Sequence, residues 1–256
     1  MIQSLARALE LLDALKKPDE EFTIAYLSER LQLPPSTVHR ILQTLCEYRF
    51  VVKDERAHTY KLGPALIPLG TVVRHNLKLQ YPVTPTLKSL SSTINEDSYF
   101  IVPMGYKGLI LERSESDNML NVVDRFGYER YLHSGANRKA ILSHLPKAFI
   151  DDYIQNALPL ADALPKTTAE KLLPQLEQAK AEGVAVSYGE YITGTIGIGS
   201  PVFDYEGKVK GSIGVIIPEY RVKNELHLDE LKQIIKKHAY DLSISMGYSP
   251  SLSPLT

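Results

Sequence analysis

The chain has 256 residues, with 29 Lys and Arg balanced by 30 Asp and Glu, for a formal net charge of -1. Its 44% hydrophobic and 23% charged residues are typical of a globular protein, and no run approaches the roughly 18 apolar residues that a membrane span needs. The balance excludes a protein that is basic throughout, so any contact with nucleic acid must come from a local patch. The length favours two domains.

The N-terminal segment 1–17, MIQSLARALELLDALKK, carries acidic residues among its leucines and lacks the pattern of a secretory signal. It predicts a first helix, with an apolar face formed by Leu5, Leu9, Leu12 and Leu15. The single cysteine, Cys46, excludes intramolecular disulfides and fits a reducing compartment. We therefore expect a cytoplasmic protein.

The segment 33–45, LPPSTVHRILQTL, predicts an amphipathic helix. Its apolar residues recur at the i, i+3, i+4, i+7 spacing of one helix face: Val38, Ile41, Leu42 and Leu45. The opposite face carries short hydroxyls and long donors: Ser36, Thr37, His39, Arg40 and Gln43. Hydroxyl and backbone N–H groups at the helix start can bind phosphate, and Arg40 can reach guanine or the DNA backbone. The alternative is a face that only meets water.

The neighbouring segments place this helix in a known type of DNA-binding module. A helix from Ile24, with Thr23 as N-cap, precedes it, and two strand-like pieces, 50–53 and 59–62, flank a charged tip after it. The order of three helices and a hairpin is that of a winged helix-turn-helix, in which Lys53 and Arg56 could contact phosphates from the wing. Because acids and bases balance within residues 1–63, affinity should depend on geometry and on the pairing of subunits.

The remainder predicts a second domain with a single antiparallel sheet. A linker helix over 64–79 follows the hairpin, and we place the boundary near residue 75, giving domains 1–75 and 76–250. Strands are expected at 98–104, 107–113, 120–124, 185–192, 195–204 and 208–218, with helices at 136–145, 147–158, 168–183 and 226–247. Strands, helices, strands and a closing helix indicate an α+β sensor domain.

Four motifs together resemble the IclR-type bacterial transcription regulators: LPPSTVHRILQTL with a wing ending in YKLG, LHSGANRKAIL, EGVAVSYGEYITGTIGIGSPVFD and GSIGVIIPEYR. The resemblance implies a winged helix-turn-helix domain that binds double-stranded DNA at a near-palindromic operator as a homodimer or homotetramer. It also implies a C-terminal domain, similar to GAF and PAS sensors, that binds a small organic acid and alters operator occupancy or RNA polymerase recruitment. The first helix and the linker helix are expected to form dimer contacts.

The resemblance, with the loop before the 136–145 helix, suggests where the acid binds. Loop N–H groups and the positive end of that helix suit a carboxylate, and glycines on adjacent strands leave room for a ligand. The candidate residues are Ser134, Gly135, Ala136, Asn137, Ser187, Thr195, Gly197, Gly214 and Ile216. The plainer alternative is that the loop only caps a structural helix.

Several residues depart from the family pattern. Gln32 and Arg49 stand where the family usually has Gly, so both would be strained if these positions need positive φ. The residues at pocket positions (Ser187, Gly197, Gly214, Ile216) predict a larger, less polar cavity, and hence an acid larger than glyoxylate or pyruvate. Alternatively, Tyr188, Tyr191 or Arg138 fills the space and occludes the pocket.

Signatures of catalysis are poor. The chain has no P-loop or G-x-S-x-G motif, GTIGIG has its glycines in the wrong order for a dinucleotide site, and the seven histidines lack metal-ligand spacing. We therefore expect no catalytic residues, no metal and no cofactor. The protein is expected to be a regulator, either a repressor or an activator, and not an enzyme. Two alternatives stay open: a small-molecule-binding module with protein partners, and an enzyme acting on an organic acid.

Overall fold

The computed structural model describes residues 2–16, 22–76, 80–118, 127, 129–160, 167–190 and 192–249. The chain divides into two compact units, Met1–Lys78 and Leu79–Thr256, which are described separately. The expected strand at 120–124 and Tyr191 lie outside the described residues. Within the described part, no helix combines the length and apolar character needed to cross a membrane.

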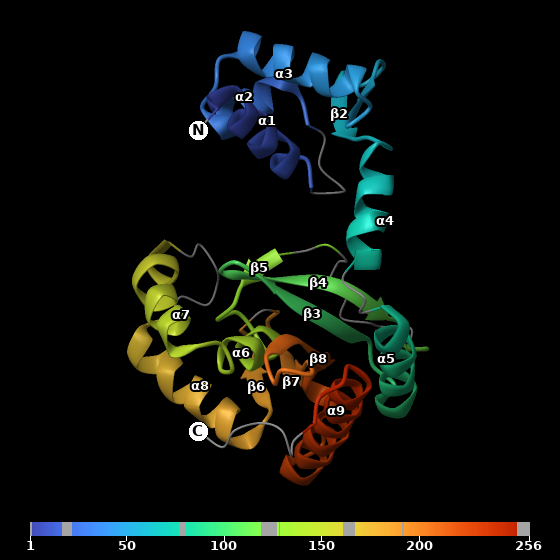
Figure 1. Cartoon of the computed structure of the whole chain (residues 1–256), viewed down its shortest axis with the longest axis vertical. Helices are drawn as coiled ribbons and strands as arrows, with labels where there is room; N and C mark the ends of the chain where they lie inside the picture. The colour runs from blue at the N-terminus through green and yellow to red at the C-terminus, as the bar shows by residue number, and fades with distance from the viewer. Residues whose placement is uncertain are drawn as a thin grey trace. The chain divides into compact units, whose positions relative to one another are not determined.

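The N-terminal unit is a winged helix-turn-helix (Figure 1). Its elements are α1 (Gln3–Ala14), α2 (Ile24–Leu31), α3 (Pro35–Glu47), the hairpin β1 (Val51–Asp54) and β2 (Thr59–Leu62), and α4 (Leu66–Asn76). One core joins the helices to the wing, with Leu11, Leu27, Leu42 and Val51 almost completely buried. The Thr23 hydroxyl caps α2 by accepting from the Tyr26 N–H at 3.2 Å, as the sequence predicts.

The apolar face of α1 differs from the expected one. Leu11, Ala14 and Leu15 are buried, whereas Leu5 and Leu9 are 55% and 58% exposed. Both sets of residues recur at helical spacing, so periodicity alone does not choose between them. The predicted apolar face therefore lies only partly in the core, and α1 keeps an apolar ridge, with Leu5 and Leu9, outside the core of its own unit.

Gln32 and Arg49 have positive φ, as does His58 in the wing. Gln32 ends α2 with φ 52° and ψ 41°, and Arg49 follows α3 with φ 60°. The α2–α3 turn is held by two hydrogen bonds, from the Leu33 N–H to the Ser28 carbonyl and from the Ser28 hydroxyl to the Leu33 carbonyl. Positive φ is thus required where the family usually has glycine, and a side chain with a Cβ is strained there.

We expect Gln32→Gly to stabilise the N-terminal unit by about 1 kcal/mol, because glycine removes the steric cost of the left-handed conformation. Gln32→Ala is the control, since it keeps the Cβ and loses the bond from Gln32 Nε2 to the Glu29 carbonyl. Native-state hydrogen exchange of α2 and α3 amides measures the opening free energy. Equal protection in the two variants would contradict the strain.

The described residues of the C-terminal unit form one six-stranded antiparallel sheet in the order β5-β4-β3-β8-β7-β6. Its strands are β3 (Ser98–Met104), β4 (Lys107–Ser114), β5 (Glu129–Tyr131), β6 (Ala185–Tyr188), β7 (Thr195–Phe203) and β8 (Val209–Pro218). Its helices are α5 (Gln80–Ile94), α6 (Ala136–Leu142), α7 (Lys147–Asp152), α8 (Ala169–Glu182) and α9 (Glu225–Ser245). The α+β class is confirmed.

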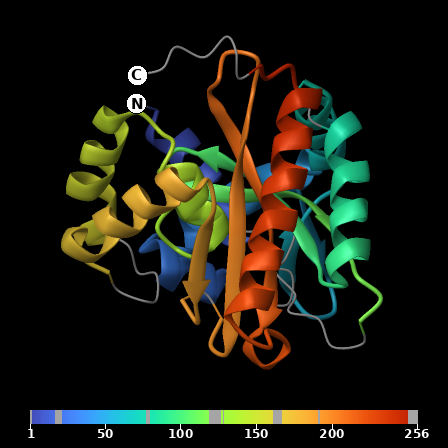
Figure 2. The ribbon, with the colours of Figure 1, turned by 90° about the horizontal axis from the view of Figure 1, so that it is seen from below.

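Helices cover both faces of this sheet. In Figure 2, α5 and α9 lie side by side on one face, and α6 lies behind the strands on the other. On β8, Ile213, Val215 and Ile217 pack with α5 and α9, whereas Ile216 packs on the opposite side. The alternation follows from the two-residue period of a strand, and it places Gly197, Gly199 and Gly214 on the face that α6 covers.

Candidate nucleic-acid interface and ligand cavity

The start of α3 is fixed by two prolines. Pro34 is the N-cap and Pro35 the first helical residue, a position for which the fixed φ of proline is suited. Ser36 follows on the exposed side, and the Thr37 N–H donates to the Pro34 carbonyl at 2.9 Å. A phosphate at this helix end would therefore meet the Ser36 backbone and the two hydroxyls.

The exposed face of α3 matches the predicted DNA-reading face. His39, Arg40 and Gln43 are exposed, while Val38 and Leu42 are buried against α1 and the wing. The helix carries no acidic residue between Pro35 and Cys46. A rigid helix thus presents a guanidinium, an imidazole and an amide, which are side chains able to bond base edges.

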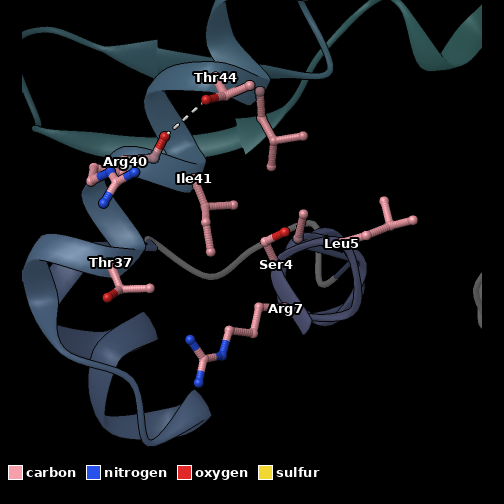
Figure 3. A pocket seen from close by; sticks show the side chains of 9 residues that line it. Ser4, Leu5, Arg7, Thr37, Arg40, Ile41 and Thr44 are labelled. Carbon is pink, nitrogen blue, oxygen red and sulfur yellow. Dashed lines mark hydrogen bonds between the residues drawn. The ribbon is translucent and has the colours of Figure 1, made fainter. Parts of the chain in front are cut away.

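A surface pocket of about 510 Å³ lies between one side of α1 and one side of α3. Figure 3 shows Ile41 extending from α3 toward α1, and Arg7 extending from α1 toward the side on which Thr37 and Arg40 lie. Leu5 and Ala8 contribute further apolar lining from α1. The arginines of both helices therefore border one surface of the unit.

The wing carries compensated charge. Lys53 Nζ donates to Glu55 Oε2 at 2.6 Å, and this contact raises the Lys53 pKa. The N–H groups of Arg56 and Ala57 donate to Asp54 Oδ1, which folds the tip and lowers the Asp54 pKa. Arg56 at the tip and Lys61 on β2 are both exposed, so these wing cations have their side chains in solvent.

A small cavity lies between α6 and the sheet of the C-terminal unit. Its volume is about 20 Å³, room for about one water molecule. Seven of the nine predicted ligand residues line it: Gly135, Ala136, Asn137, Ser187, Thr195, Gly197 and Ile216. Ile101 and Arg138 complete the lining. Residues from a loop, a helix and four strands thus meet at one place.

Gly214 and Ser134 do not line the cavity. A Cβ on Gly214 would lie 2.3 Å from Asn137 Oδ1, and one on Gly199 would lie 2.5 Å from the Asn137 Cα. These glycines therefore admit Asn137 of α6, and the expectation that they leave room for a ligand was wrong. Ser134 is buried, and its hydroxyl has no hydrogen-bond partner among the described residues.

The cavity is also smaller than predicted. Ser187 lies directly across from Gly197 in the β6–β7 ladder, and its hydroxyl accepts from the Ala136 N–H at 3.0 Å. Arg138 is 2% exposed, and its stem occupies the space beside Gly108. Because the residues at pocket positions are small, neighbouring groups occupy part of the space. Tyr188 does not fill the cavity, since its side chain is 61% exposed to solvent.

In a comparison with known protein families, each of the two units matches a family model. Residues 4–55 match the model of the IclR helix-turn-helix domain, and residues 71–244 match that of the bacterial transcriptional regulator IclR C-terminal domain. The chain belongs to the IclR family. It is 28% identical over 249 residues to the HTH-type transcriptional regulator KipR of Bacillus subtilis, covering 96% of this chain and 98% of that protein.

Solved IclR structures share the fold. An IclR regulator from Silicibacter sp. TM1040 matches with a TM-score of 0.82 and 21% identity over 98% of both chains. An IclR homologue from Microbacterium hydrocarbonoxydans, solved with 4-hydroxybenzoate, matches with a TM-score of 0.78 and 20% identity, covering 95% of this chain and 98% of that one. Since the named relatives are transcriptional regulators, the family supports the expectation that this protein is not an enzyme.

A buried ion pair fixes α6 of this IclR-family protein beside the cavity. Lys139 is 3% exposed, and its Nζ donates to Glu190 Oε1 at 2.5 Å and to Gln175 Oε1 at 2.6 Å. Burial lowers the Lys139 pKa, and Glu190 opposes that shift. Sequence reasoning missed this pair, because Lys139 and Glu190 lie on separate elements and no local pattern joins them.

His133 adds a buried titratable group to the IclR effector domain. The Tyr153 hydroxyl accepts from the His133 backbone N–H and lies 2.7 Å from its ring Nδ1. Burial is the main cause that lowers the His133 pKa to about 4, with the Lys139 charge contributing. Among the residues the structure describes, no three His, Cys, Asp or Glu side chains gather as metal ligands would.

The effector domain should lose stability in acid. Histidine in the unfolded chain takes up a proton below about pH 6.5, whereas His133 in the folded domain does so only near pH 4. The contribution of His133 to the free energy of unfolding is therefore fully present above pH 6.5 and is lost as the pH falls from 6.5 toward 4. We expect urea unfolding to show about 2 kcal/mol less stability at pH 5 than at pH 7.5 from this group. His133→Gln should have a flatter pH profile; the same slope in both proteins would exclude His133 as the source.

Proposed function

We propose that this protein is a ligand-responsive transcriptional regulator that reads operator DNA with α3 and contacts the flanking backbone with its wing. The exposed face of α3 carries the proposal, because His39, Arg40 and Gln43 stand together on a helix held by a buried core. Ser36 and Thr37 would bind phosphate at the helix start, and Lys53 and Arg56 would do so from the wing.

We propose a homodimer or homotetramer as the DNA-binding form. Two helices of the N-terminal unit expose apolar side chains: Ile2, Leu5 and Leu9 beside α1, and Ile67, Leu69, Val72 and Val73 on α4. A second copy would cover such surfaces, and a two-fold axis presents two copies of α3. The operator is then a near-palindrome with half-sites about one DNA turn apart.

We propose that the cavity at α6 binds a small organic acid. Its loop amides and the Arg138 guanidinium favour an anion, and a relative of the same fold binds 4-hydroxybenzoate. The preference for an acid larger than glyoxylate or pyruvate stays a prediction, because at about 20 Å³ the cavity must open for either. The acid can change operator affinity only by as much as its own affinity differs between the two conformations of the protein, one that favours DNA and one that does not.

The proposed role places the protein in the cytoplasm. The lone Cys46 fits that compartment, and DNA is the partner there. The acid would act by changing operator occupancy or contact with RNA polymerase, without a cofactor.

Selection from a pool of genomic fragments tests the proposal. The wild-type protein is incubated with the pool at near-physiological salt, and retained fragments are sequenced. Enrichment of a near-palindrome supports a sequence-specific regulator. Retention that is uniform across fragments and vanishes with added salt would contradict it, since that is the behaviour of non-specific binding.

A further inference from the structure

A second cavity of the C-terminal unit lies on the side of the sheet that α5 and α9 cover. It forms where α5 ends, where the short helical turn Glu219–Arg221 follows β8, and where α9 begins. Its volume is about 220 Å³, and it shares no lining residue with the cavity at α6. Pockets for drug-sized ligands begin at roughly 300 Å³, so this one suits a smaller metabolite. Its lining residues are Ile94, Asn95, Glu96, Asn118, Ile217, Arg221, His227 and Leu231.

Two opposite charges line this cavity and contact each other. Glu96 is 4% exposed, and both of its carboxylate oxygens accept from Arg221 Nη1 at 2.8 Å. One nitrogen makes both bonds, so the guanidinium does not form with this carboxylate the two-nitrogen fork of the strongest such pairs. Burial raises the Glu96 pKa, although Arg221 opposes the rise. The buried carboxylate is therefore incompletely compensated, and a further cation beside it would be stabilised.

The rest of the lining combines amides with an aliphatic surface. Asn95 Nδ2 donates to Asn118 Oδ1 at 3.2 Å, which holds the end of α5 beside the segment that follows β4. Ile217 and Leu231 are 2% and 4% exposed, and both belong to the core between the sheet and α9. A small molecule in this cavity would thus meet a carboxylate, a guanidinium and aliphatic side chains within one space.

We propose that this cavity is a second ligand site, which takes an α-amino acid with an aliphatic side chain. The ligand ammonium would bond the Glu96 carboxylate, the ligand carboxylate would bond the Arg221 guanidinium, and the aliphatic side chain would pack on Ile217 and Leu231.

The separation of charge in the ligand is the basis of its recognition. When a zwitterion enters between Glu96 and Arg221, each of the two side chains exchanges one charged partner for another. A molecule with a single charge would leave either Glu96 or Arg221 without a partner, which is costly for a buried ion pair. Because this site is separate from the one proposed for the organic acid, the regulator would respond to two small molecules.

Calorimetric titration of the full-length protein with L-leucine and L-valine tests the proposal. Two further probes each keep the carbon skeleton of leucine and lack one charge: isoamylamine has no carboxylate, and isocaproate has no ammonium. L-leucine should bind about tenfold more tightly than either, or better still, because each probe loses hydrogen bonds to a charged group.

Two variants place the bound amino acid in this cavity. Glu96→Gln keeps the shape of the side chain and removes its charge, so L-leucine should bind about tenfold more weakly or worse. Leu231→Phe leaves the ion pair in place and fills the aliphatic part of the cavity, so it should abolish binding. Asp97→Asn is the matched control: Asp97 is 1% exposed and pairs with Arg113 at 2.7 Å, but it does not line the cavity. Its affinity should equal that of the wild type.

Thermal unfolding of each variant, followed by circular dichroism, shows whether it is folded, and Leu231→Phe decides the test if Glu96→Gln is not. The proposal is overturned if neither amino acid binds the wild type, or if isoamylamine or isocaproate binds as tightly as L-leucine. It is also overturned if the folded variants bind L-leucine as the wild type does, since the amino acid would then lie elsewhere.

Discussion

Replacing Arg40 by alanine should weaken operator binding about five- to 150-fold per half-site, the range that a loss of about 1–3 kcal/mol in a base contact produces. Arg40 is exposed on α3 between His39 and Gln43, and the acidic residue of the helix, Glu47, lies seven residues further along it. Because each subunit of a dimer loses the same contact, the effect on the full operator should exceed that on a half-site.

Anisotropy titrations against the selected fragment and an unrelated one of equal length check this prediction. Loss confined to the selected fragment assigns Arg40 to a base; equal loss on both, with a shallower salt dependence, assigns it to phosphate. Arg130→Ala is the control, since it removes the same charge from an exposed position on β5 of the other unit. Unchanged affinity in Arg40→Ala would contradict the assignment of α3 as the reading helix.

Gly214→Ala should destabilise the effector domain by about 3 kcal/mol, at the upper end of the usual cost of overpacking. The new Cβ would lie 2.0 Å from the Ile198 carbonyl oxygen and 2.3 Å from Asn137 Oδ1. The first of these atoms is backbone in the neighbouring strand, so β7 and β8 would have to separate. The contact of Asn137 with Gly214, through which α6 packs on the sheet, would also be lost.

Thermal unfolding followed by circular dichroism measures the change, which should appear as a fall of about 6–12 °C in the midpoint for a unit of this size. Gly70→Ala is the control: no atom lies within 4 Å of its added Cβ, and alanine is favoured within a helix such as α4. A midpoint for Gly214→Ala equal to that of the control would mean that α6 does not approach the sheet as closely as described.

The order of elements could be predicted from sequence because each has a local signal. The stripe of α3, the Thr23 cap and the β-branched runs of β7 and β8 are read from neighbouring residues alone. β5, only Glu129–Tyr131, is too short to show a period. The strain at Gln32 and Arg49 was predictable once positive φ was required there.

The sequence predicted which residues lie around the candidate cavity, but not the size of the cavity. Glycines on a strand signal the close approach of another group, yet they do not say which group. Here Asn137 takes the space at Gly199 and Gly214, and the Ser187 hydroxyl takes the space at Gly197. The closing of the cavity depends on contacts between elements more than 40 residues apart, for which the sequence carries no local pattern.

Hydroxyl-radical footprinting on the selected fragment tests most directly that two copies of the winged helix-turn-helix read DNA together. We expect two protected segments related by a two-fold axis, with centres about one helical turn apart, and we expect Arg40→Ala to lose both. A single protected segment, or uniform protection along the fragment, would contradict a paired readout of the operator by α3.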